Sequence, residues 1–431
     1  MSRPHDPQQL DQLLRSCVEC GLCLPSCATY LATGNEAHSP RGRLMLLGEV
    51  LHERLDAQDP SVRQAFDHCL GCMACSATCP SGVSFDLLAH LQELAAEPVS
   101  MAGPVPVSLM DRGSVLSPLR RAGTQARSLL RRLAGDRWRQ RLDGGLAPAS
   151  RLARLLGSLP ASPETDAELM GLLDRLCGRA GGQWVGQQSP STGPRLLLFT
   201  GCADEHLLPG TARRLRVTFE SLGCEVVVAS GQECCGALAS HTARPERARQ
   251  LQQVNLESLG PDLATCDHLV VAAAGCGLEL KSYPAPVTDK VVDAVVLLEQ
   301  LVKNDLSPVP LKVAIHDPCH ARHGQGIVAE PRRLLAHIPG LDLLEPAEAD
   351  VCCGGAGLYG VQHPELSQAM GRRKAEILTD TGCDLVVTSN PGCLGQIADG
   401  LALIAPDIPI LPLSDLVWYA QQGRETTEAR V

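Results

Sequence analysis

Two short segments decide the fold of the N-terminal region: CVECGLCLPSC at residues 17–27 and CLGCMACSATCP at residues 69–80. In each segment two residues separate successive members of the first three cysteines, and three residues separate the third cysteine from the fourth. Such tight spacers let one loop offer three thiolates to a compact four-iron core, and in two-cluster ferredoxins the fourth cysteine of each motif ligates the other cluster. The pattern therefore predicts two [4Fe–4S] clusters, the first held by Cys17, Cys20, Cys23 and Cys79 and the second by Cys69, Cys72, Cys75 and Cys27. Two zinc sites are the main alternative, although zinc motifs seldom use this run of spacings twice.

The composition agrees with metal ligation in a reducing compartment. The chain has 431 residues, 20 cysteines and a net charge of −10, and it is long enough to form several cores without disulfides. Residues 1–16 are polar and contain no apolar signal-peptide core, so we expect a cytoplasmic protein whose clustered cysteines bind metal or act in redox chemistry. No apolar run is long enough to span a membrane. The acidic balance and the 3% aromatic content argue against a nucleic-acid partner.

The second half of the chain contains an internal repeat. Each copy reads a cysteine, then Cys-Cys-Gly, then Gly-Cys, and corresponding positions lie 117 or 118 residues apart. The matched residues are Cys202 with Cys319, Cys234-Cys235 with Cys352-Cys353, Cys266 with Cys383, and Cys276 with Cys393. This register predicts that one structural unit has been duplicated.

The hydropathy pattern predicts α/β layers for both copies. Short β-rich runs alternate with helical patterns, which favours a largely parallel sheet. Strands are expected at 196–200, 225–229, 269–273, 313–316 and 385–388, and helices at 41–55, 85–97, 244–259, 291–302 and 365–378. We therefore expect an α+β chain: a mostly helical 2[4Fe–4S] ferredoxin-like domain at 1–98, a helical basic linker at 99–194, and two α/β cysteine-rich repeats at 195–305 and 306–431.

The motifs and their surroundings resemble a known family. The stretches CGLCLPSCATYLATGNEAHSPRGRLMLL and CLGCMACSATCPSGV, with the two Cys-Cys-Gly units, are similar to the iron–sulfur subunit of bacterial glycolate oxidase. The resemblance covers nearly the whole chain. It implies an electron-transfer subunit of an oxidoreductase complex whose acceptor is not NAD. A partner subunit would carry FAD and oxidise a 2-hydroxy acid such as glycolate, and this chain would pass the electrons towards quinone.

Two alternative functions follow from related families. Similar iron–sulfur subunits serve D-lactate and anaerobic glycerol-3-phosphate dehydrogenases, so the substrate stays open. The duplicated unit also resembles the cysteine-rich domain of the heterodisulfide reductase catalytic subunit, which makes a stand-alone thiol reductase the second alternative. A third alternative, which does not depend on these families, is a structural scaffold that binds metal but has no redox role.

The resemblance leaves the metal content of the repeats open. In the heterodisulfide reductase relatives each Cys-Cys-Gly domain can hold a non-cubane cluster and ends in C-x-x-C, but Glu279 and Gln396 occupy the final position here. The remaining thiols either hold a further iron–sulfur cluster in each repeat or pack as small apolar groups. These thiols are Cys202, Cys234, Cys235 and Cys276 in the first repeat and Cys319, Cys352, Cys353 and Cys393 in the second. We expect Cys266 and Cys383 to be core residues.

Three histidines surround Cys319 in the segment HDPCHARH, residues 316–323. His316, His320 and His323 would tune a cluster or relay protons if they face it, and otherwise they are ordinary loop residues.

A glycine-rich stretch at 355–360 matches the dinucleotide fingerprint G-x-G-x-x-G. It follows a Cys-Cys pair and not a predicted strand, and no acidic residue closes a following βαβ unit, so we read it as a loop. We expect no flavin or NAD site and no catalytic residues in this chain. The flavin chemistry would then require an FAD-binding partner subunit.

The linker is strongly basic. Between Arg112 and Arg154 there are eleven arginines and two aspartates, with leucines at spacings compatible with an amphipathic helix. Such a segment can lie on an anionic membrane surface or contact an acidic partner, and the alternative is a solvated charged face. We therefore expect a peripheral contact with the cytoplasmic face of the inner membrane.

Overall fold

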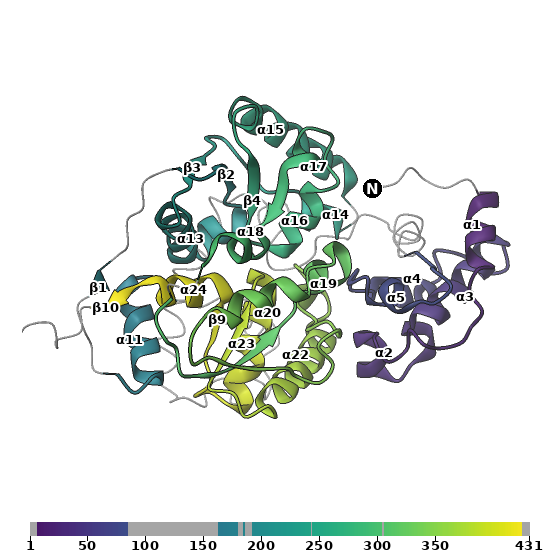
Figure 1. The fold of residues 1–431 in the computed structure, drawn as a ribbon. Helices are drawn as coiled ribbons and strands as arrows, with labels where there is room; N and C mark the ends of the chain where they lie inside the picture. Colours follow the sequence, from purple (N-terminus) through teal and green to yellow (C-terminus); the bar gives the residue numbers. More distant parts are fainter. Residues whose placement is uncertain are drawn as a thin grey trace, which may run out of the picture.

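The protein consists of a small helical N-terminal domain beside a larger body that contains two parallel sheets (Figure 1). The computed structural model describes residues 7–84, 163–179, 184–185, 192–242, 244–303 and 306–424. The helix expected at 85–97 and the basic segment 112–154 lie outside these residues. No helix in the described ranges is both long and apolar enough to cross a membrane.

Short helices hold the two cysteine motifs in place. Ser39 and Asp59 each accept a hydrogen bond from the first turn of the helix that follows, and a proline stands at the start of each helix. The helices pack on a small core that includes Leu47 and Phe66. The elements are α1 (Pro7–Leu14), α2 (Ala28–Thr33), the 3-10 helix η1 (Glu36–His38), α3 (Pro40–Leu51), α4 (Pro60–Asp67) and α5 (Ala74–Thr78).

Each cysteine-rich repeat forms one four-stranded parallel sheet. The strand orders are β3-β2-β4-β5 and β7-β6-β8-β9, so the two sheets have the same topology. The strands of the first are β2 (Arg195–Phe199), β3 (Glu225–Val228), β4 (His268–Val271) and β5 (Val291–Asp293). Those of the second are β6 (Lys312–His316), β7 (Asp342–Leu344), β8 (Leu385–Thr388) and β9 (Ile410–Pro412). The predicted α/β architecture of both repeats is confirmed.

The helices follow the same duplication. Those of the first repeat are α12 (Cys202–His206), α13 (Pro209–Ser221), α14 (Ala237–Ser240), α15 (Pro245–Leu263), α16 (Ala274–Leu280), α17 (Val287–Lys290) and α18 (Ala294–Leu301). Those of the second are α19 (Cys319–Gln325), α20 (Ala329–Ala336), α21 (Tyr359–Gln362), α22 (Pro364–Thr379), α23 (Pro391–Ile404) and α24 (Leu413–Gln421). The prediction of a helix at 291–302 was wrong for its first three residues, because residues 291–293 pair with β4 as strand β5.

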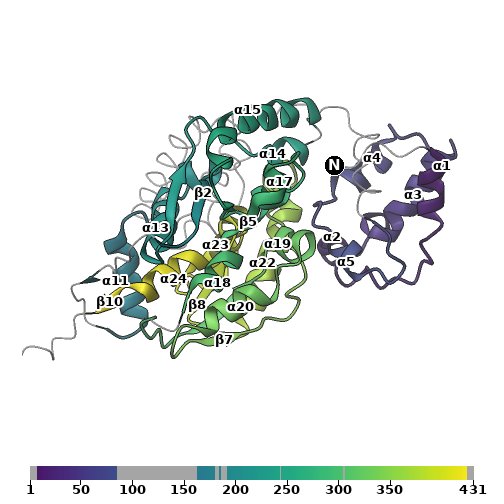
Figure 2. The ribbon, with the colours of Figure 1, turned by 45° about the horizontal axis from the view of Figure 1, so that its top comes forward.

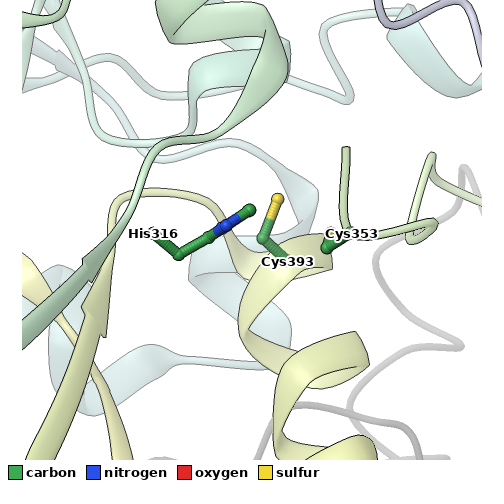
Figure 3. A group of neighbouring side chains, drawn as sticks. All are labelled: His316, Cys353 and Cys393. Atoms are coloured by element: carbon green, nitrogen blue, oxygen red, sulfur yellow. The ribbon is translucent and has the colours of Figure 1, made fainter. Parts of the chain in front are cut away.

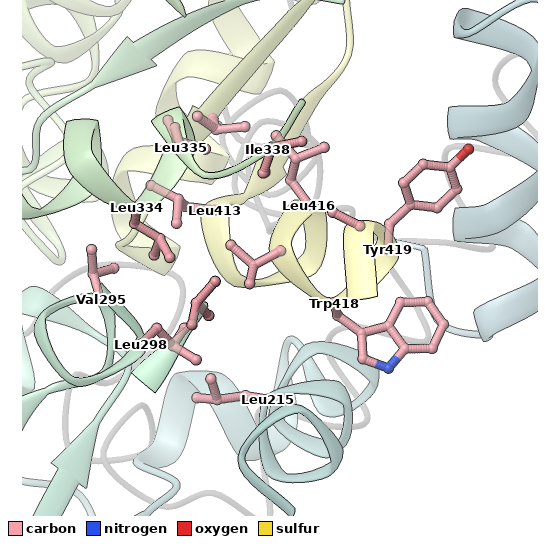
Figure 4. Packing of buried hydrophobic residues seen from close by; sticks show 14 of the residues in the cluster. Leu215, Val295, Leu298, Leu334, Leu335, Ile338, Leu413, Leu416, Trp418 and Tyr419 are labelled. Carbon is pink, nitrogen blue, oxygen red and sulfur yellow. The ribbon is translucent and has the colours of Figure 1, made fainter. Parts of the chain in front are cut away.

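The two repeats share one hydrophobic core. Leu198 of β2 and Val387 of β8 belong to the same cluster, together with residues of α18, α20 and α24 (Figure 4). Helix α24, the last of the second repeat, lies against α13 of the first. The repeats are therefore one packed body in which each sheet has a fixed position relative to the other.

Part of the predicted linker belongs to this body. Helix α11 (Asp166–Leu176) begins with a capping box between Thr165 and Glu168 and packs on the shared core. The Tyr419 hydroxyl of α24 donates a hydrogen bond to the Asp174 carboxylate across 2.7 Å. Strand β1 (Trp184–Val185) pairs antiparallel with β10 (Gly423–Arg424). These contacts tie the segment before the first repeat to the end of the second.

A fully buried ion pair crosses the contact between α13 and α24. The Arg214 guanidinium donates to both Asp415 carboxylate oxygens, at 2.9 and 2.7 Å, and neither side chain is exposed to solvent. Thr211 donates a further hydrogen bond to the same carboxylate. A buried pair of this kind adds little net stability against an apolar pair, but it strongly penalises the loss of one partner.

Replacing Asp415 with Asn should destabilise the body of the protein, because the buried Arg214 would lose its bidentate counter-ion and keep only Asp166, 3.5 Å from its Nη1 atom. We expect a loss of about 3–5 kcal/mol, measured as a fall in the thermal unfolding midpoint. The matched control is Arg213→Gln, which breaks the exposed neighbouring pair with Asp166 and should cost less than about 1 kcal/mol. Equal midpoints for the two variants would show that the buried pair does not hold the repeats together.

Candidate iron–sulfur centres

The first cysteine motif surrounds a small cavity at the outer end of the N-terminal domain. The cavity is lined by Cys17, Cys20 and Cys23 from one loop and by Cys79, which follows α5. Cys75, which we assigned to the second cluster, also lines it. The structure thus brings together the four thiols predicted for the first cluster, and their role as its ligands stays a prediction.

A buried cation accompanies the second group of thiols. Arg43 of α3 is only 2% exposed, and its guanidinium lies 3.9 Å from the Cys27 sulfur. The same side chain donates hydrogen bonds to the Ala65 carbonyl and the Thr29 hydroxyl, which fix its position. Burial raises the pKa of Cys69, and the charge of Arg43 opposes that rise. Arg43 therefore stabilises negative charge on this set of sulfurs.

The second motif contacts the second repeat. The pKa of Cys72 is raised well above its usual range. The main cause is a hydrogen bond with the Cys352 thiol, and burial is the next. Helix α5 contacts α19, and α2 contacts α22, so the N-terminal domain rests on the second repeat at this point (Figure 2). The Tyr359 hydroxyl also donates to the His68 carbonyl across 3.2 Å. Cys72 is partly buried and packs against the apolar cluster that contains Cys352, so thiols from distant parts of the sequence meet here.

The four thiols of the second repeat form one continuous set. The Cys352 sulfur lies 3.9 Å from that of Cys319, and Cys353 forms hydrogen bonds with Cys352 and Cys393. Gly354 follows with a φ of +84°, and an added Cβ atom would lie 2.8 Å from Met370, so the Cys-Cys-Gly turn requires glycine. The Gly354 amide donates to the Cys352 sulfur, as backbone amides do around sulfur ligands.

A second buried cation lies beside this set. Lys374 of α22 is almost fully buried and donates its ammonium hydrogen to the Glu348 carbonyl across 2.6 Å. Burial lowers the pKa of Lys374, while the nearby charges of Cys353 and Cys352 oppose that change. In the first repeat, helix α15 instead offers neutral Asn255, whose amide donates to the Cys234 carbonyl.

The first repeat contains the same arrangement of thiols. Cys202, Cys234, Cys235 and Cys276 are all buried and are linked in that order by hydrogen bonds. Glu279, at the last position of the C-x-x-C pattern considered above, accepts a hydrogen bond from Ser240 across 2.8 Å. Burial raises the pKa of Glu279.

Both repeats present their thiols to one shared cavity of about 350 Å³. Its lining includes all eight repeat cysteines and also Leu70 of the N-terminal domain. The rings of His241 and His320, one from each repeat, stack there with centroids 5.0 Å apart. The His320 Nε2 atom also lies 3.2 Å from the Gly71 carbonyl, so this histidine joins all three cysteine-bearing domains.

The three histidines around Cys319 differ in their contacts. His320 contacts Gly71 and His241, and the His323 Nε2 atom lies 2.7 Å from the Asp350 carbonyl. His316 ends β6 and points toward Cys353 and Cys393 (Figure 3). Burial, together with the charge of Lys374, lowers the pKa of His316 to about 3, so its ring is neutral. Of the three, only His316 thus faces the repeat thiols closely enough to share a metal ion with them.

The remaining cysteines lie apart from these sets. Cys266 and Cys383 are buried in the apolar clusters behind each sheet, as expected for core residues. Cys224 is also buried in the shared core, and Cys177 packs against that core while partly exposed. None of these four described cysteines forms a disulfide.

The donor sets suit iron–sulfur cofactors. The cysteines are free thiols, and burial raises the pKa of Cys75 and contributes to the raised pKa of Cys353. Bound iron would hold the sulfurs as thiolates. Thiols in groups of four, with a buried cation beside two of the groups, match the needs of an anionic cluster.

Sequence reasoning missed the two buried cations. Arg43 and Lys374 stand in helical segments whose other charged residues face solvent, so their spacing gave no sign of burial. The segment S-P-R-G-R at 39–43 carries one signal for a buried Arg43. Its cap at Ser39 starts helix α3 at Pro40, which places Arg43 one turn into the helix and beside Cys27.

Comparison with known proteins agrees with this arrangement. Residues 13–83 match the family model of a 4Fe-4S dicluster domain, and residues 196–281 and 313–398 each match that of a cysteine-rich domain. The predicted iron–sulfur cofactors and the duplication are thus confirmed.

Three relatives illustrate the resemblance. The probable glycolate oxidase iron–sulfur subunit of Bacillus subtilis is 30% identical, over 96% of this chain and 95% of its own length. The glycolate oxidase iron–sulfur subunit of Escherichia coli is 28% identical over 90% of this chain and 91% of its own. A CoM/CoB fumarate reductase chain of Methanothermobacter marburgensis is 34% identical over 50% of this chain and 44% of its own.

The Bacillus subtilis relative is 30% identical and is matched over nearly its full length and nearly the full length of this chain. The chain therefore belongs to the family of glycolate oxidase iron–sulfur subunits.

Proposed function

We propose that this chain is the electron-transfer subunit of a flavin-dependent 2-hydroxy acid dehydrogenase. It carries electrons from FAD on a partner subunit towards membrane quinone. The observation that carries the proposal is the packing of Cys72 against the cluster that contains Cys352, which joins the N-terminal domain to the second repeat. A continuous series of thiols is what an electron-transfer protein needs and what a structural metal site does not.

The residues of this chain would hold and tune the cofactors. Cys17, Cys20, Cys23 and Cys79 would ligate one [4Fe–4S] cluster, and Cys69, Cys72, Cys75 and Cys27 the other. When bound, such clusters accept and release single electrons at potentials set by charge, hydrogen bonds and burial. Arg43 supplies charge, and the surrounding helices exclude water from Cys27. We further propose that the four thiols of each repeat hold additional iron–sulfur centres.

The entry point for electrons is the outer end of the N-terminal domain. Cys20 is exposed there, between Val18 and Leu22, which are 69% and 56% exposed. Exposed apolar side chains around a cofactor site are typical of a protein interface. The FAD-binding subunit would contact this loop, which brings its flavin close to the first cluster.

Glycolate is the proposed substrate of the complex, and the partner subunit would bind it. The two relatives that match over nearly their full length are named for glycolate oxidase. Shorter matches, such as the lactate utilization protein A of Bacillus subtilis, keep D-lactate as the alternative. The basic segment 112–154 remains our candidate for contact with an anionic membrane surface.

A thiol reductase is the second candidate function. The shared cavity between the repeats favours it, because eight thiols line a space large enough for a small substrate. The absence of a fifth cysteine at 279 and 396 argues against it. Reduction of a disulfide substrate by the isolated, prereduced chain would support this candidate.

Replacing Cys72 with Ser should separate the two half-reactions of the complex. With the FAD subunit present, flavin reduction by glycolate should be unchanged, while quinone reduction should fall at least about tenfold, because a thiol in the series is lost. Cys177→Ser is the control, since this cysteine lies outside every set. Full quinone reduction by the Cys72 variant would contradict the proposed function.

Replacing Arg43 with Met should lower the reduction potential of the second cluster. A buried cation stabilises the more negative, reduced form, so we expect a fall on the order of 60 mV, a tenfold change in a one-electron equilibrium. Arg43→Lys keeps the charge and should shift the potential less. Potentiometric titration followed by EPR gives both values, and identical potentials for wild type and Arg43→Met would exclude this role.

Replacing Leu22 with Lys should weaken binding of the FAD subunit. A charge in a desolvated interface should raise Kd by about tenfold or more, equivalent to about 1.4 kcal/mol. Val254→Lys, a similar change on α15 of the first repeat, is the control. Calorimetry or light scattering measures both, and unchanged affinity of the Leu22 variant would place the interface elsewhere.

A further inference from the structure

A buried histidine completes the cysteine set of the second repeat. The candidate ligand atoms of His316, Cys353 and Cys393 all lie within 4.8 Å of one another, and all three side chains are buried. They come from three separate elements: the end of β6, the loop before α21 and the first turn of α23 (Figure 3). A neutral imidazole nitrogen beside thiolates is a common donor set for iron and zinc.

The His316 nitrogen has no other role among the described residues. His316 is 2% exposed, and its Nε2 atom has no hydrogen-bond partner in the part of the chain that the structure describes. A buried polar atom without a partner carries a free-energy cost, so its retention requires an explanation. Coordination of a metal by this nitrogen would remove that cost.

The first repeat lacks this feature. The position equivalent to His316, 117 residues earlier, is Phe199, which packs in an apolar cluster with Cys235 and Cys276. The duplicated unit therefore has two chemically different versions. In one an aromatic ring fills the space beside the thiols, and in the other a potential nitrogen ligand does.

The missing fifth thiol explains why a nitrogen would be useful in the second repeat. Gln396 stands at that position, but its amide donates to the Ser367 carbonyl and its oxygen lies 3.2 Å from the Ser367 hydroxyl. Gln396 is thus committed to α22 and does not replace the lost sulfur. His316 approaches the same thiols from the sheet.

We propose that His316 is a nitrogen ligand of an iron–sulfur centre in the second repeat, together with Cys319, Cys352, Cys353 and Cys393. This inference rests on the proposed function, because it assumes that the repeat holds such a centre. A neutral imidazole in place of an anionic thiolate raises the potential of a cluster, as in Rieske centres. The second repeat, which contacts Cys72, would then attract electrons from the N-terminal domain.

Nitrogen hyperfine coupling tests the proposal directly. The full chain, purified without oxygen and labelled with ¹⁵N-histidine, should show a histidine coupling in pulsed EPR of the reduced protein. In His316→Cys, which supplies a thiolate instead, the coupling should disappear while the iron content stays within the wild-type range. In His316→Phe, which reproduces the first repeat, the coupling should also disappear, whereas in His316→Cys the potential of the centre in this repeat should fall, because a thiolate replaces a neutral ligand.

His323→Gln is the matched control, because His323 belongs to the same segment but contacts the Asp350 carbonyl. It should keep both the iron and the coupling. A coupling that persists in His316→Cys, no coupling in a wild-type protein with iron beyond two clusters, or zinc in place of iron at this site would each overturn the inference. The signals of the two N-terminal clusters report separately on the proposed function, which fails only if they are absent or are not reduced by the flavin subunit.

Discussion

The structure depends on one contact, the packing of the partly buried Cys72 of the N-terminal domain against the cluster that contains Cys352 of the second repeat. Free cysteines often pack as small apolar groups, but the meeting of thiols from two separate motifs suits a redox or metal-binding role. The contact lies where α5 meets α19, and His320 adds a polar link to Gly71 at the same place. It turns two groups of cysteines, separated by most of the sequence, into one region of the molecule.

The rest of the fold maintains this contact. The repeats share a hydrophobic core, and the buried pair of Arg214 and Asp415 fixes α24 against α13. Both repeats pack on this core, and both sets of repeat thiols line the same cavity. The duplicated unit has nevertheless diverged: Lys374 and His316 lie near the thiols of the second repeat, whereas Asn255 and Phe199 lie near those of the first. The second repeat is thereby suited to a metal centre that carries more negative charge and has a different set of ligands.

The sequence predicted the parts of this arrangement that local patterns encode. The cysteine spacings indicated the iron–sulfur domain, and the 117-residue register indicated the duplication, because ligand positions tolerate few insertions. The buried strand β8 was predicted with its observed bounds, since it reads as a continuous apolar run. Edge strand β7 has only three residues and gave no such signal, and the Val-rich start of 291–302 resembled a helix. Burial of Arg43 and the meeting of Cys72 with Cys352 depend on tertiary packing, which no local pattern records.

The central claim is that electrons from a hydroxy acid reach the cysteine-bound centres of this chain. Rapid freeze-quench EPR of the complex with its FAD subunit, mixed with glycolate without oxygen, measures this most directly. The account predicts that reduced [4Fe–4S] signals appear within one turnover and disappear when a quinone is added. Complete reduction of the flavin with no change in the iron–sulfur signals would contradict it.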